Sequence, residues 1–317
     1  MSSLAQYLWQ KAKALPHNIA LVDKTSSQRF RRGATGLGAE GHAGETCSFG
    51  QFHQRVSQLA HGIALTIGLR QGDRIGLFLE NRSEFLDLLF ACWHLGACAV
   101  PINAKLHPKE VAHIANDCGI KALFTSESQI EALRDAITQI ELNLVLVDVD
   151  SVSYYSLYDH PAMSLQQVMS NDLAWIFYTS GTTGKPKGAM LTHRNLLFMS
   201  MAYSSDIEIV QPGDHKVHAA PLSHGSGLYA LPHLLGGGTQ VILNGFDTEE
   251  VLSALDQFQN VTMFAAPTMV TRLMHSVERR GEFPGLRTLY YGGGPMYVND
   301  LQTALDCFGP RLYQLYG

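Results

Sequence analysis

Apolar runs rich in β-branched residues alternate along this chain with stretches of helical periodicity, and this alternation constrains its fold more than any other feature. The apolar runs predict eight buried strands, at residues 74–79, 97–102, 121–125, 143–149, 173–179, 239–243, 261–266 and 286–292. Apolar residues recur at helical spacing in six other segments, at 49–68, 83–96, 107–119, 128–140, 193–204 and 248–258. Strands alternating with helices predict an α/β fold with mostly parallel sheets covered by helices.

The longest apolar stretch, residues 85–100, predicts a buried helix followed by a strand. It is 16 residues long and contains Asp87, His94 and Gly96, whereas a membrane-spanning helix needs about 20 apolar residues. We expect the helix to continue to about Leu95 and the glycine to end it. Because the N-terminus has no signal-peptide layout either, the sequence predicts a cytoplasmic protein without a transmembrane segment.

Residues 26–50 form the weakest part of this pattern and predict a surface loop, because they are rich in glycine and polar residues. Gly36, Gly38 and Gly41 have G-x-G-x-x-G spacing. The dinucleotide-binding fingerprint requires a strand before it and a helix directly after it, and neither flank fits. A second break in the pattern falls at residues 152–172.

Composition and charge exclude several classes of function. Hydrophobic residues make up 46% of the chain and charged residues 16%, which is typical of a globular protein with a large core. The net charge of -5 comes without a basic stripe, so no nucleic-acid partner is predicted. The cysteines lack metal-ligand spacing and are expected to be buried, reduced thiols: Cys47, Cys92, Cys98, Cys118 and Cys307.

The loop "TSGTTGKPKG", which follows the predicted strand 173–179, has the ingredients of a phosphate-binding site. Glycines let backbone N–H groups approach an anion, and the hydroxyl groups can donate to phosphate oxygens. Lys185 and Lys187 supply positive charge. The loop is not a Walker A motif, because only two residues separate Gly181 from Gly184 where four are required.

Together with the preceding tyrosine, this loop resembles the signature loop of the adenylate-forming (AMP-binding) enzymes. The resemblance extends over essentially the whole chain and is greatest to the acyl-CoA synthetases that act on fatty or aromatic acids. It implies a large N-terminal domain of two α/β subdomains with mostly parallel sheets. Further segments that resemble the family are "APLSHGSGLY" (220–229), "FAAPTMVTRLM" (264–274), "LYYGGGPM" (289–296) and "LYQLYG" (312–317).

The resemblance implies a reaction in two steps. A carboxylic acid reacts with ATP to give acyl-AMP and pyrophosphate, and coenzyme A then takes the acyl group. Mg²⁺ is expected only as the partner of ATP, and no residue is assigned as a metal ligand. The residues that the resemblance assigns to ATP and AMP are Thr179, Ser180, Gly181, Thr182, Thr183, Gly184 and Lys185 at the phosphates, and Gly292, Gly293, Gly294, Pro295 and Tyr316 at the adenine.

On the acyl side, the resemblance places His224 beside the reacting carboxylate, although a lone histidine can also be a hydrogen-bonded core residue. Lys187 would help to fix the phosphate loop. Ser223 stands where many relatives carry Phe and is expected to widen the entrance. Small apolar residues favour a medium-chain or long-chain fatty acid, or an aromatic acid. The residues expected to line the acyl pocket are Ser226, Gly227, Tyr229, Pro267 and Met269.

Relatives continue beyond the point that corresponds to Gly317, so the resemblance implies a truncated large domain that is expected to be inactive by itself. The implied subdomains are residues 51–205 and residues 1–50 with 206–317. A catalytically silent nucleotide-binding or acyl-binding module remains an alternative, as does an adenylating enzyme whose acceptor is not coenzyme A. The sequence does not predict an oligomeric state.

Overall fold

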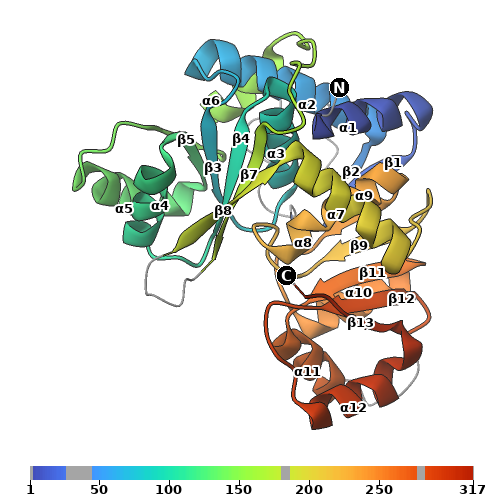
Figure 1. The fold of residues 1–317 in the computed structure, drawn as a ribbon. Coiled ribbons are helices and arrows are strands. Elements are labelled where there is room, and N and C mark those ends of the chain that lie inside the picture. The colour runs from blue at the N-terminus through green and yellow to red at the C-terminus, as the bar shows by residue number, and fades with distance from the viewer. Residues whose placement is uncertain (1–2, 26–44, 180–185, 277–282, 317) are drawn as a thin grey trace.

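The structure, a computed structural model, describes residues 3–25, 45–179, 186–276 and 283–316 and confirms the predicted α/β class (Figure 1). Within these residues, the first sheet, sheet A, has the strand order β13 (Leu312–Gln314), β12 (Leu286–Tyr291), β11 (Val261–Ala265), β9 (His215–His218), β10 (Thr239–Ile242), β1 (Ile19–Asp23) and β2 (Glu45–Ser48). The second, sheet B, has the order β6 (Val145–Asp148), β5 (Ile120–Thr125), β3 (Arg74–Leu79), β4 (Cys98–Asn103), β7 (Leu173–Thr179) and β8 (Lys187–Thr192). Among the described strands, only the edge strands β2 and β8 run antiparallel to their neighbours.

All eight predicted strands are present, and the sequence missed β1, β2, β8, β9 and β13. The prediction of a surface loop at residues 26–50 is wrong for its last six residues, because residues 45–48 form the strand β2 and Phe49 begins the helix α2. Residues 26–44 lie outside the described part. The sequence pattern does not predict β9, because two buried polar residues, Lys216 and His218, interrupt its apolar run.

The helices of the described residues are α1 (Leu4–Ala14), α2 (Phe49–Gly62), α3 (Ser83–Leu95), α4 (Pro108–Cys118), α5 (Glu127–Thr138), α6 (Val152–Tyr155), α7 (His193–Asp206), α8 (Gly225–Leu228), α9 (Ala230–Gly236), α10 (Thr248–Gln257), α11 (Pro267–Ser276) and α12 (Val298–Phe308). Local sequence sets several of their ends. Thr192 caps α7 by accepting a hydrogen bond from the Asn195 backbone N–H, and Ser48 caps α2 through Gln51 in the same way. Gly96 ends α3 in the left-handed conformation, as predicted.

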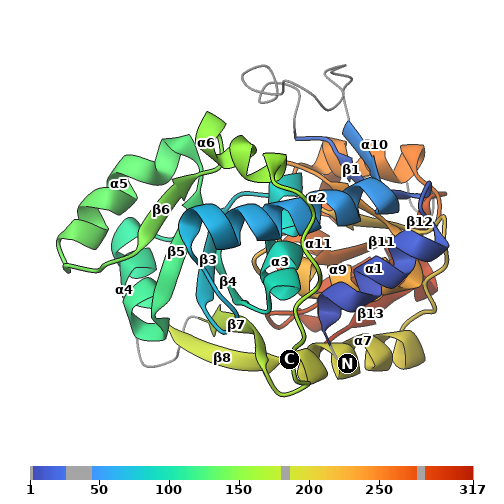
Figure 2. The same cartoon turned by 90° about the horizontal axis from the view of Figure 1, so that it is seen from above.

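Helix α3 is buried along its whole length, which confirms the buried helix predicted for this stretch. It lies in one hydrophobic core with α1, α2 and strands of both sheets (Figure 2). Helices α10, α11 and α12 cover the other face of sheet A, and α4 and α5 cover the other face of sheet B. The described residues include no helix with the length and apolarity to cross a membrane.

The start of α3 carries a buried ion-pair cluster. Arg82 forms two hydrogen bonds of 2.9 Å to the carboxylate of Glu84 and a third, also 2.9 Å, to Asp150 beyond β6. Burial alone would raise the pKa of Glu84, but the hydrogen bonds and charge of Arg82 outweigh it and lower this pKa to about 2. Folding therefore stabilises the charged form of Glu84.

The first prediction concerns acid stability. Because the pKa of Glu84 falls from 4.5 unfolded to about 2 folded, its contribution is complete above pH 4.5 and is lost as the pH falls toward 2. This contribution amounts to about 3 kcal/mol at neutral pH. We expect urea unfolding to show that the free energy of unfolding falls less for Glu84→Gln than for the parent as the pH is lowered through this range. Parallel losses in the two proteins would contradict the prediction.

Candidate functional site

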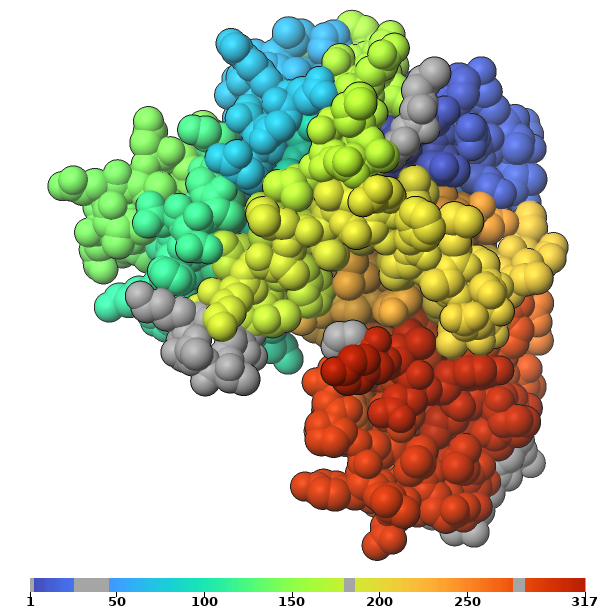
Figure 3. Space-filling view, viewed as in Figure 1, coloured from blue at the N-terminus to red at the C-terminus, as the bar shows by residue number. Residues whose placement is uncertain are grey.

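One edge of sheet A gathers most of the residues that the sequence singled out. Because β9, β11, β12 and β13 are parallel neighbours, their carboxyl ends meet at the same edge. The segments that leave this edge carry His224, Pro267, Gly292 and Tyr316, in that order along the chain. Figure 1 shows α8 and the C-terminal end of the chain in this region, and Figure 3 shows the molecule hollowed between its green and orange-red parts there.

The predicted phosphate loop connects β7 to β8 of sheet B. Thr179 and Lys187 are paired in register at the base of this antiparallel hairpin, and both are exposed. Gly188 follows directly, and a Cβ atom there would lie 2.7 Å from the Ile176 side chain. The loop residues Ser180, Gly181, Thr182, Thr183, Gly184 and Lys185 lie outside the described part.

His224 lies between the two sheets at this edge. It immediately precedes α8, and its ring packs edge-on against Phe177 of β7, with the ring centroids 5.6 Å apart. Side chains two residues apart on a strand share a face, so the Phe177 ring that contacts His224 lies on the same face of β7 as the Thr179 side chain. Burial lowers the pKa of His224 below its ordinary value of 6.5, which keeps the imidazole neutral at pH 7. Ser223 shares a 2.9 Å hydrogen bond with its Nδ1 atom, a contact that the sequence did not predict.

Asn81, which follows β3 of sheet B, fixes the backbone that leads to His224. Its side-chain amide donates to the carbonyl oxygens of His218 and Ala220 at 3.2 and 3.1 Å, and its oxygen accepts from the Leu222 N–H at 2.8 Å. The Asn81 side chain is 5% exposed. Three hydrogen bonds from one buried amide thus tie sheet B to the segment of sheet A that positions His224.

The predicted adenine-side residues lie at the ends of β12 and β13. Gly292 is buried, and a Cβ atom on it would lie 2.9 Å from the carbonyl oxygen of Leu315. Gly293 has a left-handed φ of 79°, which favours glycine. Pro295 and Tyr316 are exposed, as is Gly294. Gly292 thus packs against the backbone that directly precedes the exposed Tyr316.

Phe264 of β11, which the sequence does not identify as a site residue, joins the His224 segment to the glycine wall at residues 292–294. A Cβ atom on Gly225 would lie 2.8 Å from the Phe264 ring, and one on Gly292 would lie 3.7 Å from it. Pro267 and Met269 follow β11 at the start of α11 and are half-buried. The part-exposed ring of Tyr229 packs against the ring of Tyr290.

Two of the predicted pocket residues have packing roles in the structure. The hydroxyl of Ser226 is fully buried and forms a 2.8 Å hydrogen bond with His218 Nδ1. His218 is held on its other side by Gln240 at 3.0 Å. A Cβ atom on Gly227 would lie 1.8 Å from the carbonyl oxygen of Leu222, so this position requires glycine because the backbone approaches closely.

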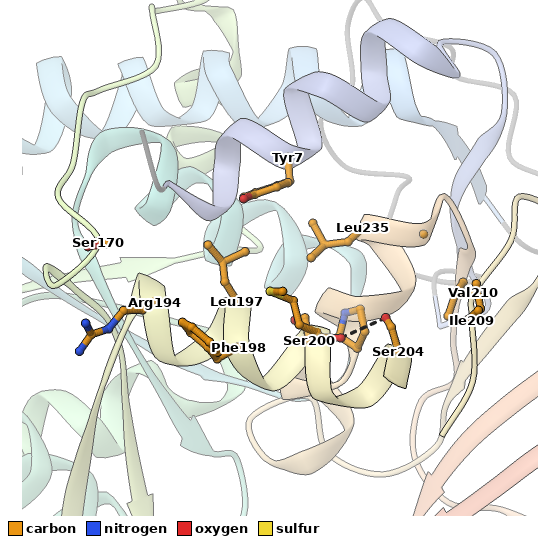
Figure 4. Close-up of a pocket in the computed structure, with 13 residues that line it drawn as sticks. Tyr7, Ser170, Arg194, Leu197, Phe198, Ser200, Ser204, Ile209, Val210 and Leu235 are labelled. Atoms are coloured by element: carbon orange, nitrogen blue, oxygen red, sulfur yellow. Dashed lines mark hydrogen bonds between the residues drawn. The ribbon is translucent and has the colours of Figure 1, made fainter. Parts of the chain in front are cut away.

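A cavity of about 690 Å³ lies away from this edge, among α1, α7 and α9 (Figure 4). Leu197 of α7, Leu235 of α9 and Tyr7 of α1 line it, and its other described lining residues are also outside the predicted site. In the described part of the chain, no group of three or more His, Cys, Asp or Glu residues could hold a metal ion.

Comparison with known proteins matches the chain to one family. The family model described as "AMP-binding enzyme" covers residues 8–317. The chain is 33% identical over 279 residues to a feruloyl-CoA synthase from Amycolatopsis sp, covering 87% of this chain and 55% of that protein. It is 34% identical over 270 residues to a 2-succinylbenzoate–CoA ligase from Bacillus licheniformis, covering 84% and 53%. The chain thus spans about half the length of the curated relatives it matches.

Solved structures show the same fold. The ATP-bound structure of MatB from Rhodopseudomonas palustris superposes with a TM-score of 0.84 at 24% identity, covering 100% of this chain and 59% of that chain. An o-succinylbenzoate CoA synthetase (MenE) from Bacillus subtilis gives a TM-score of 0.80 at 26% identity, covering 98% and 58%.

The second prediction tests the link that Asn81 makes between the sheets. Asn81→Ala removes three hydrogen bonds and leaves buried backbone groups without a partner, which should lower the free energy of unfolding by about 2–4 kcal/mol. The exposed Asn299 on α12 offers a matched control, because Asn299→Ala removes an amide outside the core. Urea unfolding at neutral pH measures both. Equal stability of the two variants would show that the buried amide does not join the sheets.

Proposed function

The chain belongs to the AMP-binding enzyme family, and from this premise we propose that the full protein activates a carboxylic acid with ATP and transfers the acyl group to coenzyme A. The observation that carries the proposal is the contact between Phe177 of β7, in sheet B, and His224, at the edge of sheet A where the glycine wall also lies. The names of the relatives, which include feruloyl-CoA synthase and 2-succinylbenzoate–CoA ligase, support coenzyme A as the acceptor.

In the first step, an oxygen of the carboxylate attacks the α-phosphorus of ATP. A new O–P bond forms, the bond from the α-phosphorus to the bridging oxygen breaks, and pyrophosphate leaves. In the second step, the deprotonated thiol of coenzyme A attacks the acyl carbon and AMP leaves. Because negative charge builds on the departing pyrophosphate, lysines and hydroxyls at the β7–β8 hairpin would act where the charge develops. Mg²⁺ would accompany ATP and share in neutralising its phosphates.

His224 is proposed to orient the attacking carboxylate. A neutral imidazole can donate one N–H to a carboxylate oxygen while its other nitrogen accepts from Ser223. The Phe177 ring and the backbone fixed by Asn81 hold the imidazole in place. Such fixed geometry lowers the barrier chiefly by positioning the reacting groups.

The adenine is proposed to bind between the backbone wall at Gly292–Gly294 and the ring of Tyr316. The acyl group would then extend past Pro267, Met269 and Tyr229 along sheet A. A medium-chain or long-chain fatty acid, or an aromatic acid, is the proposed substrate class. Since ATP and coenzyme A are the co-substrates, the cytoplasm is the proposed compartment.

A different acceptor is the alternative for the second step. The fatty acid–[acyl-carrier-protein] ligase ScoC from Streptomyces coeruleorubidus is 26% identical over 280 residues, covering 86% of this chain. Transfer to a carrier-protein thiol uses the same adenylate and would leave the first step unchanged. Thioester formation with free coenzyme A as the only acceptor separates the two alternatives.

The test of the proposed function is acid-dependent pyrophosphate release by the full-length protein. The panel should run from acetate to palmitate and include cinnamate-type acids. We expect release with at least one class among the medium-chain, long-chain and aromatic acids, and little with acetate. Absence of acid-dependent release across the panel would favour a catalytically silent binding module.

Two variants of the full-length protein separate the proposed roles. Lys187→Ala should lower kcat/KM for ATP by at least about 10-fold, a loss of roughly 1.4 kcal/mol in transition-state stabilisation. His224→Ala should lower kcat while nucleotide affinity changes little, because its partner is the carboxylate. Lys121→Ala and His275→Ala are matched controls at exposed positions. The role of His224 would be wrong if its loss abolished ATP binding but left turnover at saturation intact.

A further inference from the structure

Strand β9 carries a buried lysine that the proposed mechanism does not use. Lys216 is 0% exposed, and its ammonium contacts both the hydroxyl and the ring face of Tyr290, which is also 0% exposed. Central strands of a parallel sheet are normally apolar on both faces. Burial lowers the pKa of Lys216 well below 10.5, which shows how unfavourable this location is for the charged group. Such residues are retained where they have a function or a fixed partner.

A continuous line of side chains leads from the candidate site to Lys216. Phe264 lies against the Gly225 and Gly292 positions at the edge of sheet A, and its ring centroid is 5.6 Å from that of Tyr290. The part-exposed ring of Tyr229 contacts Tyr290 from the other side at 5.2 Å. The Tyr290 hydroxyl then meets Lys216. An acyl group that passes between Phe264 and Tyr229 therefore approaches this pair.

The depth of the pair limits the acyl group that can reach it. Tyr290 of β12 lies two residues before Gly292, which corresponds to about 7 Å along an extended chain. One aromatic ring or a short chain spans this depth. A group at the far end of such an acid would lie near the Lys216 amine and the Tyr290 hydroxyl.

A purely structural role for Lys216 is the competing explanation. Glu208 accepts hydrogen bonds from Thr262 and Thr288, and Arg287 forms ion pairs of 2.8 Å with both Glu208 and Asp214. Two carboxylates then face one guanidinium, and a protonated Lys216 would balance their charge. This role predicts that removing the lysine affects all substrates alike, whereas a contact with substrate predicts a change in selectivity.

We propose that Lys216 and Tyr290 form a polar floor to the acyl pocket and select aromatic acids whose far end carries a hydrogen-bond acceptor, such as a phenolic oxygen or a second carboxylate. The inference rests on the proposed function, because it concerns the acid that this same site activates. It narrows the proposed substrate class to aromatic acids, since the terminal methyl of an alkyl chain would offer no hydrogen-bond acceptor to the buried polar pair.

The experiment compares three acids of one shape in the full-length protein: cinnamic acid, 4-hydroxycinnamic acid and 4-carboxycinnamic acid. The parent should prefer at least one of the two substituted acids over cinnamic acid by about 10-fold or more in kcat/KM, because sites built to hydrogen-bond a substrate group reject analogues without it. Lys216→Met should reduce this preference to within about threefold while cinnamic acid is still activated. Tyr290→Phe removes only one hydroxyl group and should also reduce it.

The controls separate the possible failures. Lys121→Met, at an exposed position on β5, should keep the parent's preference. If Lys216→Met does not fold, Tyr290→Phe carries the test. Loss of activity by the same factor for all three acids in both variants would assign the pair a structural role and overturn the inference, as would a parent without preference. No acid-dependent pyrophosphate release from the parent with any acid would instead contradict the proposed function.

Discussion

The buried amide of Asn81 is the contact on which the geometry of the candidate site depends. It lies at the junction between β3 and α3 and bonds the backbone of residues 218–222, so one side chain joins the two sheets. Directly after it, Arg82 anchors the start of α3 through Glu84 and Asp150. Because α3 is buried between the sheets, a displacement of either sheet would disturb packing along the whole helix.

In the proposed site, this fixed junction holds together residues that are distant in sequence. His224 and the glycine wall follow strands of sheet A at their common carboxyl edge. Thr179 and Lys187 lie on the β7–β8 hairpin of sheet B. The contact between Phe177 and His224 is where the two contributions meet. Phe264 and Tyr290 also connect this edge to the buried Lys216, and all three side chains lie on one face of sheet A.

Local pattern in the sequence was sufficient for the fold class and for most elements. Apolar runs predicted the central strands, and Gly96 predicted the end of α3, because helix ends and buried strands depend on neighbouring residues. Strand β9 was missed since Lys216 breaks its pattern. The roles of Asn81, Phe264 and Ser226 could not be predicted, because each depends on contacts between segments far apart in the chain. The phosphate loop itself was recognised by resemblance, and its residues 180–185 lie outside the described part.

A crystal structure of the full-length protein with a non-hydrolysable acyl-adenylate analogue would test the proposed site. We expect the acyl oxygen to lie within hydrogen-bond distance of the His224 imidazole. We also expect the adenine to lie between the Gly292–Gly294 backbone and the Tyr316 ring. An analogue bound elsewhere, such as in the cavity among α1, α7 and α9, or one whose acyl oxygen does not contact His224, would contradict the central claim.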